Sequence, residues 1–287
     1  MRALVAAAVL PLLFGCQRGP PPNPHYVLGA PYQSAGVWFY PRDSYDADES
    51  GLAVRYAPGH APLTTDGERF DEDALAIAHA TLQLPAIARL TNLENGRQIT
   101  VRINDRGTPT PHRLTQVTQR VATLLAFPPD AVVRVRLQVL PVPSHDAADA
   151  MPDAPRLALA TAPVVAVRQS DLSPPGSPAS TVADAPVREA SAPASAPQIA
   201  RLPETITQVA PDPGALYVEL GTFQNYPYAE MQRAYVGGTG ARIVAIGEGR
   251  RPRYSVMIGP LADVRAADSM LDRVLGAGVT EARILVR

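Results

Sequence analysis

The sequence has no lysine, a single cysteine and a single tryptophan. Its 26 basic residues, all arginine, balance 27 acidic residues to a net charge of -1. This balance excludes a strongly basic nucleic-acid binder held by phosphate neutralisation alone. One cysteine excludes an intramolecular disulfide framework and a zinc site built from several cysteines. The five histidines lack metal-ligand spacing and no glycine-rich phosphate motif is present, so we expect no metal, nucleotide or other cofactor.

Proline, by contrast, is abundant. The chain has 31 prolines, about twice the usual rate. Thirteen of them lie between Pro143 and Pro213, among many alanine, serine and threonine residues and without apolar periodicity. Such a segment cannot bury enough apolar surface to fold. We therefore predict a disordered linker over residues 143–212.

The N-terminus has the pattern of an export signal. Arg2 is followed by an apolar run over residues 3–14, which is too short to span a bilayer because that takes roughly 20 residues. The lone Cys16 follows Leu13-Phe14-Gly15, which resembles a bacterial lipobox. The resemblance implies removal of residues 1–15, lipidation of Cys16 and a membrane anchor. The alternative is an ordinary secretory signal with a chance cysteine.

The residue after the cysteine bears on the destination. It is Gln17 rather than aspartate, and by analogy with Gram-negative sorting this favours the outer membrane, facing the periplasm. Four prolines between Arg18 and Pro24 indicate that residues 16–25 are a short extended spacer.

Residues 26–142 have the pattern of a small β-barrel. Strands are predicted over 86–91, 99–103 and 133–139, where apolar and polar residues alternate or apolar residues dominate. Asn95-Gly96 is a strong hairpin-turn signal between the first two. The apolar stripe from Val117 to Leu125 predicts a helix, with Thr115 as its N-cap. Short strands with one or two helices favour a barrel.

Residues 213–287 contain an internal repeat. Gly221 recurs as Gly259 and Ala229 as Ala267, both at an offset of 38 residues. Each copy reads as strand, turn, helix and strand, with Asp263 as the candidate N-cap of the second helix. Two such halves predict an α+β sandwich with both helices on one face of a sheet.

One carboxylate stands out in the barrel segment. Asp105 ends a strand in phase with the apolar residues Ile99, Val101 and Ile103, which places its side chain at the mouth of a barrel. A carboxyl group there can serve as the general acid that glycosidic cleavage requires. The alternative is that Asp105 only caps a turn before Gly107.

A series of ordered motifs accompanies Asp105. They are Gly51-Leu52-Ala53 with Tyr56, Thr64 with Gly67 to Asp71, Ala78-His79, Asn95-Gly96-Arg97, and Val101 to Gly107. This series resembles the rare lipoprotein A (RlpA) family of lytic transglycosylases. The C-terminal repeat resembles a SPOR domain, which binds septal peptidoglycan. The expected fold class is mostly β plus α+β: a double-psi β-barrel over 26–142, the linker over 143–212 and a SPOR-like domain over 213–287.

The resemblance also implies roles for individual residues. Asp105 would be the catalytic acid and then base, and Glu68 the second important carboxylate. His79, Tyr56, Asn104 and Arg106 would bind substrate. The activity implied is endolytic cleavage of MurNAc–GlcNAc bonds to 1,6-anhydro ends at the division septum, on glycan strands stripped of peptide. The plainer alternatives are a loop charge for Glu68 and a packed histidine for His79.

The sequence departs from the family pattern at several places. Val54-Arg55 replaces Ser-Trp, Ala57 replaces glycine, and Gln116-Val117-Thr118 replaces Asp-Leu-Ser. These changes remove an aromatic platform for sugar and one carboxylate. A catalytically degenerate, lipid-anchored scaffold that only binds peptidoglycan is therefore the alternative function. Trp38 lies outside the motifs, and we interpret it as a core residue; the alternative is a platform for sugar.

Overall fold

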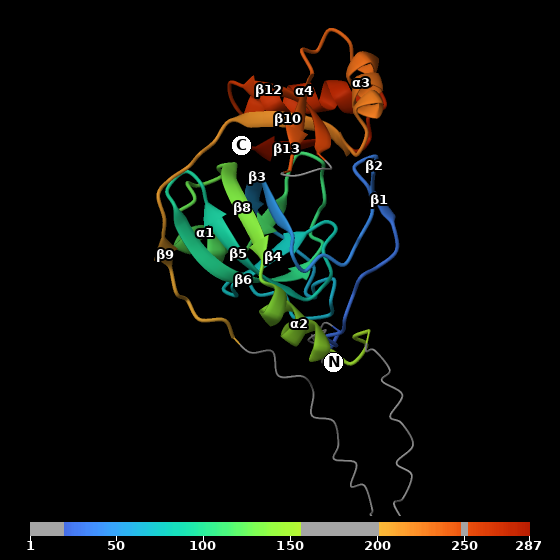
Figure 1. Ribbon diagram of the computed structural model, residues 1–287. Helices are drawn as coiled ribbons and strands as arrows, with labels where there is room; N and C mark the ends of the chain where they lie inside the picture. Colours follow the sequence, from blue (N-terminus) through green and yellow to red (C-terminus); the bar gives the residue numbers. More distant parts are fainter. Residues whose placement is uncertain (1–19, 156–200, 248–251) are drawn as a thin grey trace, which may run out of the picture. The chain divides into compact units, whose positions relative to one another are not determined.

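The computed structural model describes residues 20–155, 201–247 and 252–287 (Figure 1). The predicted signal peptide, Cys16 and residues 156–200 of the predicted linker lie outside the described residues. Within the described ranges, no helix is long and apolar enough to cross a membrane.

The N-terminal body is built around a closed sheet of six strands. Its order is β4-β7-β3-β8-β5-β6, and β6 pairs with β4 to close the ring. The elements of this body are β1 (Tyr32–Ser34), β2 (Val37–Phe39), β3 (Asp48–Arg55), β4 (Ala76–His79), β5 (Ala86–Asn92), β6 (Arg97–Asp105), β7 (Thr115–Val117), α1 (Gln119–Leu124), β8 (Val133–Val139), α2 (Pro141–Asp149) and β9 (Thr207–Gln208).

The barrel combines parallel and antiparallel strand pairs. The β3–β7 and β4–β6 pairs are parallel, whereas the other pairs of the ring are antiparallel. Alternate residues of β6 and β8, such as Val101, Ile103 and Leu137, are fully buried in one core. A closed six-stranded ring of this kind has the double-psi β-barrel architecture that the sequence predicted.

The strands agree with the sequence pattern, but the helix does not begin where it was expected. Residues 115–117 form β7, and α1 starts at Gln119. Its N-cap is Thr118, whose Oγ1 accepts a hydrogen bond from the Val121 amide at 3.4 Å. Thr115 as the N-cap is therefore wrong, because Val117 is buried as a strand residue and the helical stripe begins one turn later.

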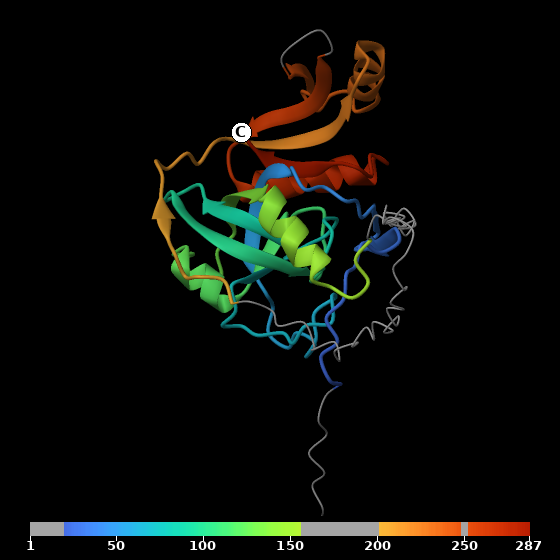
Figure 2. The same cartoon turned by 60° about the horizontal axis from the view of Figure 1, so that its bottom comes forward.

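The predicted disorder of the linker is wrong at both of its ends. Ser144 of α2 is buried, and its hydroxyl bridges the backbone N–H and C=O of Ile87 in β5 at 2.9 Å each. Figure 2 shows α2 lying across the barrel strands. At the other end, Thr207 and Gln208 pair with Gln98 and Arg97 as an added strand.

Two further expectations differ from the structure. Asn23 and His25 of the predicted spacer donate backbone hydrogen bonds of 2.9 Å to the carbonyls of Gly67 and Asp66, so this part of the segment lies on the barrel. Trp38 is 51% exposed in β2, so its interpretation as a core residue is wrong.

The C-terminal body is a four-stranded antiparallel sheet of order β11-β12-β10-β13 with two helices. Its elements are β10 (Leu216–Phe223), α3 (Tyr226–Tyr235), β11 (Arg242–Ile246), β12 (Arg253–Leu261), α4 (Val264–Gly276) and β13 (Arg283–Val286). The order strand–helix–strand occurs twice, as the repeat predicted. Gly221 and Gly259 occupy matching positions and have nearly equal φ angles of 140° and 139°. Asp263 caps α4 by accepting from the Ala266 amide at 2.8 Å.

Candidate active site

Asp105 is buried at the carboxyl end of β6, and the segment that follows β3 supplies the hydrogen-bond partners of its carboxylate. Its Oδ1 accepts from the backbone N–H of Thr65 at 2.9 Å and from the Thr65 hydroxyl at 2.6 Å. Its Oδ2 lies 3.1 Å from the Tyr56 hydroxyl and 2.8 Å from His60 Nε2. The simple turn-capping alternative does not describe this site, since four groups from one loop converge on the carboxylate.

Tyr56 and His60, which contact this carboxylate, belong to an aromatic cluster with Phe70. The His60 ring stacks on Phe70, with centroids 4.0 Å apart, and meets Tyr56 edge-on at 4.9 Å. Tyr56 in turn packs edge-on against Phe70 at 5.1 Å. The imidazole is thereby fixed in orientation, and its side chain stays 16% exposed while that of Asp105 is only 4% exposed.

Glu68 belongs to a neighbouring buried network rather than to the Asp105 cluster. Arg102 Nε donates to its Oε1 at 2.6 Å, and Asn104 Nδ2 donates to its Oε2 at 2.8 Å. No hydrogen bond or ion pair joins Glu68 or the Asn104 side chain to Asp105 in the described part of the chain. The structure thus brings Glu68 and Asn104 together in a hydrogen-bond network that is separate from the one around Asp105.

Asp66 is a member of this network that the sequence analysis did not single out. It is fully buried, and its Oδ1 accepts from the Thr64 hydroxyl at 2.7 Å and from the Glu68 amide at 3.2 Å. Among the residues that the structure describes, its Oδ2 has no hydrogen-bond partner. Burial, followed by the charge of Glu68, raises the pKa of Asp66 to about 8. The raised pKa favours the protonated form of Asp66 at neutral pH.

Arg106 holds the chain around the site together. Its guanidinium donates to the carbonyls of His79 at 3.0 Å and Leu28 at 2.9 Å, and also to that of Leu82. Burial lowers the pKa of Arg106. Its backbone amide donates to the Thr65 hydroxyl at 3.0 Å, which extends the chain of hydrogen bonds that ends on Asp105. The side chain expected to contact substrate is thus committed to backbone carbonyls.

His79 is buried at the end of β4. Its Nδ1 accepts from the amides of Thr81 and Leu82, each at 3.2 Å. Its Nε2 lies 3.7 Å from a carboxylate oxygen of Glu49. Among the described residues, no hydrogen bond or ion pair connects the His79 ring with Asp105, so the contacts seen are those of a packed histidine.

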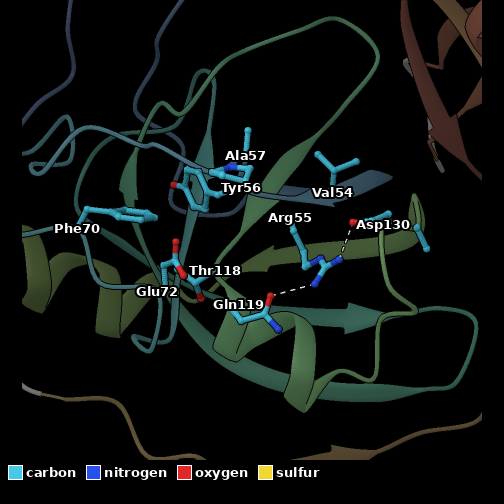
Figure 3. A pocket seen from close by; sticks show the side chains of 11 residues that line it. Val54, Arg55, Tyr56, Ala57, Phe70, Glu72, Thr118, Gln119 and Asp130 are labelled. Carbon is cyan, nitrogen blue, oxygen red and sulfur yellow. Dashed lines mark hydrogen bonds and ion pairs between the residues drawn. The ribbon is translucent and has the colours of Figure 1, made fainter.

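A groove of about 540 Å³ lies beside the aromatic cluster (Figure 3). Tyr56 and Phe70 line it, so these two rings belong both to the groove and to the Asp105 cluster. Arg55, which replaces the family's tryptophan, reaches Gln119 Oε1 at 3.0 Å and Asp130 Oδ1 at 2.8 Å. The position expected to offer an aromatic platform therefore offers a cation to this groove.

Three residues that matter to this geometry were not predicted as site residues: His60, Thr65 and Asp66. All lie in the loop between β3 and β4, where the sequence has no helical or strand periodicity from which the direction of a side chain could be predicted. Thr65 and Asp66 sit inside the Thr64 to Asp71 motif, which was the one available signal. The arrangement as a whole, a buried carboxyl paired with an imidazole beside a groove, suits acid–base chemistry.

Comparison with known families agrees with this architecture. Residues 48–137 match a family of double-psi β-barrels described as "Lytic transglycolase". The matched range runs from β3 to β8 and contains Tyr56, His60, Glu68 and Asp105. Over residues 48–137, the barrel of this chain is therefore similar to this family.

Several relatives carry the name "Endolytic peptidoglycan transglycosylase RlpA". The protein of Rickettsia felis is 32% identical over 121 residues, which are 41% of this chain and 53% of the relative. That of Rickettsia prowazekii is 34% identical over 121 residues, 41% of this chain and 38% of the relative. The protein of Pseudomonas aeruginosa UCBPP-PA14 is 28% identical over 268 residues, 88% of this chain and 76% of the relative. The match thus spans about half or less of the rickettsial relatives.

Proposed function

We propose that this protein is an endolytic peptidoglycan lytic transglycosylase. It would cleave the bond between MurNAc and GlcNAc in glycan strands and leave 1,6-anhydro ends. The observation that carries this proposal is the buried Asp105 with its four converging partners in a barrel of the lytic transglycolase family. The relatives' shared name gives the same reaction class.

The chemistry needs a single carboxyl group. Asp105 protonates the leaving glycosidic oxygen, and the sugar's own 6-hydroxyl attacks C1, so no water takes part. Asp105 then accepts the proton of that hydroxyl and returns to its starting state. The groove beside Tyr56 and Phe70 offers room for the sugars next to the scissile bond.

Digestion of purified sacculi tests the proposal. Wild-type protein should release anhydro-muropeptides, whereas Asp105→Asn should release them about 10²–10⁴ times more slowly, because it cannot transfer a proton. The variant should melt and bind sacculi like wild type, since asparagine still accepts from Thr65. Wild-type protein that binds glycan but releases nothing would favour the scaffold alternative, which the cation at position 55 supports.

We propose in addition that residues 213–287 form a SPOR-like domain that binds septal, peptide-stripped glycan. The proposal is supported by its duplicated strand–helix–strand order and the matching glycines at 221 and 259. A fluorescent fusion of this segment to an export signal should concentrate at division sites. An even distribution around the cell would contradict septal binding.

The N-terminal proposal rests on sequence alone. Cys16 is lipidated after loss of residues 1–15 and anchors the protein in the outer membrane, facing the periplasm. Incorporation of a fatty-acid probe should be lost in Cys16→Ser and kept in Cys16-containing controls such as Trp38→Phe. Persistent labelling of the serine variant would disprove the anchor.

A further inference from the structure

The contact between His60 and Asp105 constrains where protons sit. His60 Nδ1 lies 2.8 Å from the carbonyl oxygen of Ala61, and His60 Nε2 lies 2.8 Å from Asp105 Oδ2. A carbonyl oxygen can only accept a hydrogen bond, so Nδ1 carries a proton. In a neutral imidazole with Nδ1 protonated, Nε2 is a bare lone pair.

Asp105 Oδ2 and the lone pair on His60 Nε2 would repel each other unless a proton lay between them. A carboxylate oxygen is also an acceptor only, and two acceptors 2.8 Å apart repel each other. The other oxygen, Oδ1, is already occupied by the two donors of Thr65. One additional proton must therefore lie between His60 Nε2 and Asp105 Oδ2.

We infer that His60 is a positioning residue that holds the transferable proton jointly with Asp105. The pair exists either as a carboxylic acid beside neutral imidazole or as a carboxylate beside imidazolium, and both forms have the same net charge. Phe70 and Tyr56 fix the ring so that Nε2 stays directed at Oδ2. The kinetic part of this inference rests on the proposed transglycosylase activity, while the proton placement does not.

The shared proton closes the reaction cycle. In the first half, it moves from the pair to the glycosidic oxygen as the bond from C1 to that oxygen breaks, which leaves a carboxylate facing the Nε2 lone pair. That repulsion is relieved when a proton returns between Nε2 and Oδ2. In the second half, the pair takes the proton of the 6-hydroxyl as the bond from O6 to C1 forms, so that protons balance over the cycle and no water enters.

Nitrogen NMR of the full chain tests the placement directly. In ¹⁵N-histidine-labelled wild type at neutral pH, His60 Nδ1 should show a protonated shift and Nε2 a shift between the protonated and bare values. In Asp105→Asn, the side-chain amide can donate, so Nε2 should move to the bare-nitrogen value. An unprotonated Nδ1 in wild type would overturn the inference, as would an Nε2 that stays protonated in Asp105→Asn.

Kinetics test its consequence. His60→Gln should lower kcat by about 10²-fold or more with little change in KM, and imidazole added to His60→Ala should restore part of the rate. The matched control is His145→Gln, because His145 is also ring-stacked, on Tyr45 at 3.7 Å, but lies in α2. It should keep wild-type turnover.

The outcomes separate the two claims. If wild type releases no anhydro products, the proposed function fails, while the nitrogen shifts still decide where the proton lies. If wild type is active and a folded His60→Gln variant matches its kcat, the role of His60 is refuted and the proposed function stands. Loss of rate in His60→Ala that imidazole does not restore, together with a lowered melting temperature, would assign His60 a purely structural role.

Discussion

Replacing Asp66 with asparagine should change how the stability of the barrel depends on pH. Asp66 is fully buried, and its pKa in the folded protein is about 8, against 3.8 for an ordinary aspartate. Between these values the folded state holds one proton more than the unfolded state. Stability must therefore fall as pH rises through this window, by up to about 1.4 kcal/mol per pH unit. Across the two pH units from pH 5 to pH 7, this upper limit corresponds to a loss on the order of 3 kcal/mol.

Asparagine at this position cannot ionise, so this contribution disappears. Its Oδ1 can still accept from the Thr64 hydroxyl and the Glu68 amide. Urea unfolding at pH 5, 6, 7 and 8 should show wild type losing stability relative to Asp66→Asn. The control is Asp73→Asn, which removes the charge of an exposed aspartate on the same loop. Parallel pH curves for wild type and Asp66→Asn would refute the buried-proton assignment.

Two further substitutions test packing around the site. Ser144→Ala leaves the Ile87 amide without its 2.9 Å partner, while the Ile87 carbonyl keeps the Leu140 amide at 2.8 Å. The change should lower the free energy of unfolding by about 1–3 kcal/mol, measured by urea unfolding against the exposed control Val142→Ser; equal stability would contradict the bridge. In the same assay, Gly107→Ala should lower the free energy of unfolding more than Gly36→Ala does. Both glycines have a positive φ, but a Cβ at Gly107 would lie 2.4 Å from Gln116 Oε1, whereas a Cβ at Gly36 would meet nothing within 4 Å. Equal losses would show that only backbone strain matters.

Regular elements were predictable from the sequence, whereas the surroundings of the candidate acid were not. Strand alternation placed Asp105 at the inner face of β6, because a period of two fixes which side chains share a face. His60, Thr65 and Asp66 lie in an irregular loop, and tertiary hydrogen bonds alone decide where that loop folds. The Thr64 to Asp71 motif marks part of this loop, but no periodicity in the sequence gives the direction of its side chains.

The same reasoning explains the misplaced helix start and linker ends. A threonine two residues before an apolar stripe is a good cap in isolation, but pairing of Thr115 with Ala53 and His79 draws it into a strand. Ser144 lies in a proline-rich segment of low apolar content, and its burial depends on β5, which is more than fifty residues away. The composition of a segment indicates whether it can fold alone, but not whether it packs against a distant part of the chain.

The loop also explains how Glu68 can matter without touching substrate. Thr65 supplies both donors to Asp105 Oδ1, and its neighbour Asp66 is tied to the Glu68 amide. The Glu68 carboxylate, held at 2.6 Å by Arg102 Nε and at 2.8 Å by Asn104 Nδ2, therefore anchors the stretch that presents Thr65. On this account, Glu68 acts through the geometry of Thr65 and Asp105.

A double-mutant cycle distinguishes this account from direct catalysis by Glu68. Glu68→Gln and Thr65→Val should each slow anhydro-muropeptide release. The increase in activation free energy in the double variant should be much smaller than the sum of the increases in the two single variants. Residues in one hydrogen-bond network typically show coupling energies of about 0.5–3 kcal/mol. If Glu68 instead contacted the sugar independently, the two losses would add. Additive losses in folded variants would thus place Glu68 at the substrate and refute its role as the anchor of the loop.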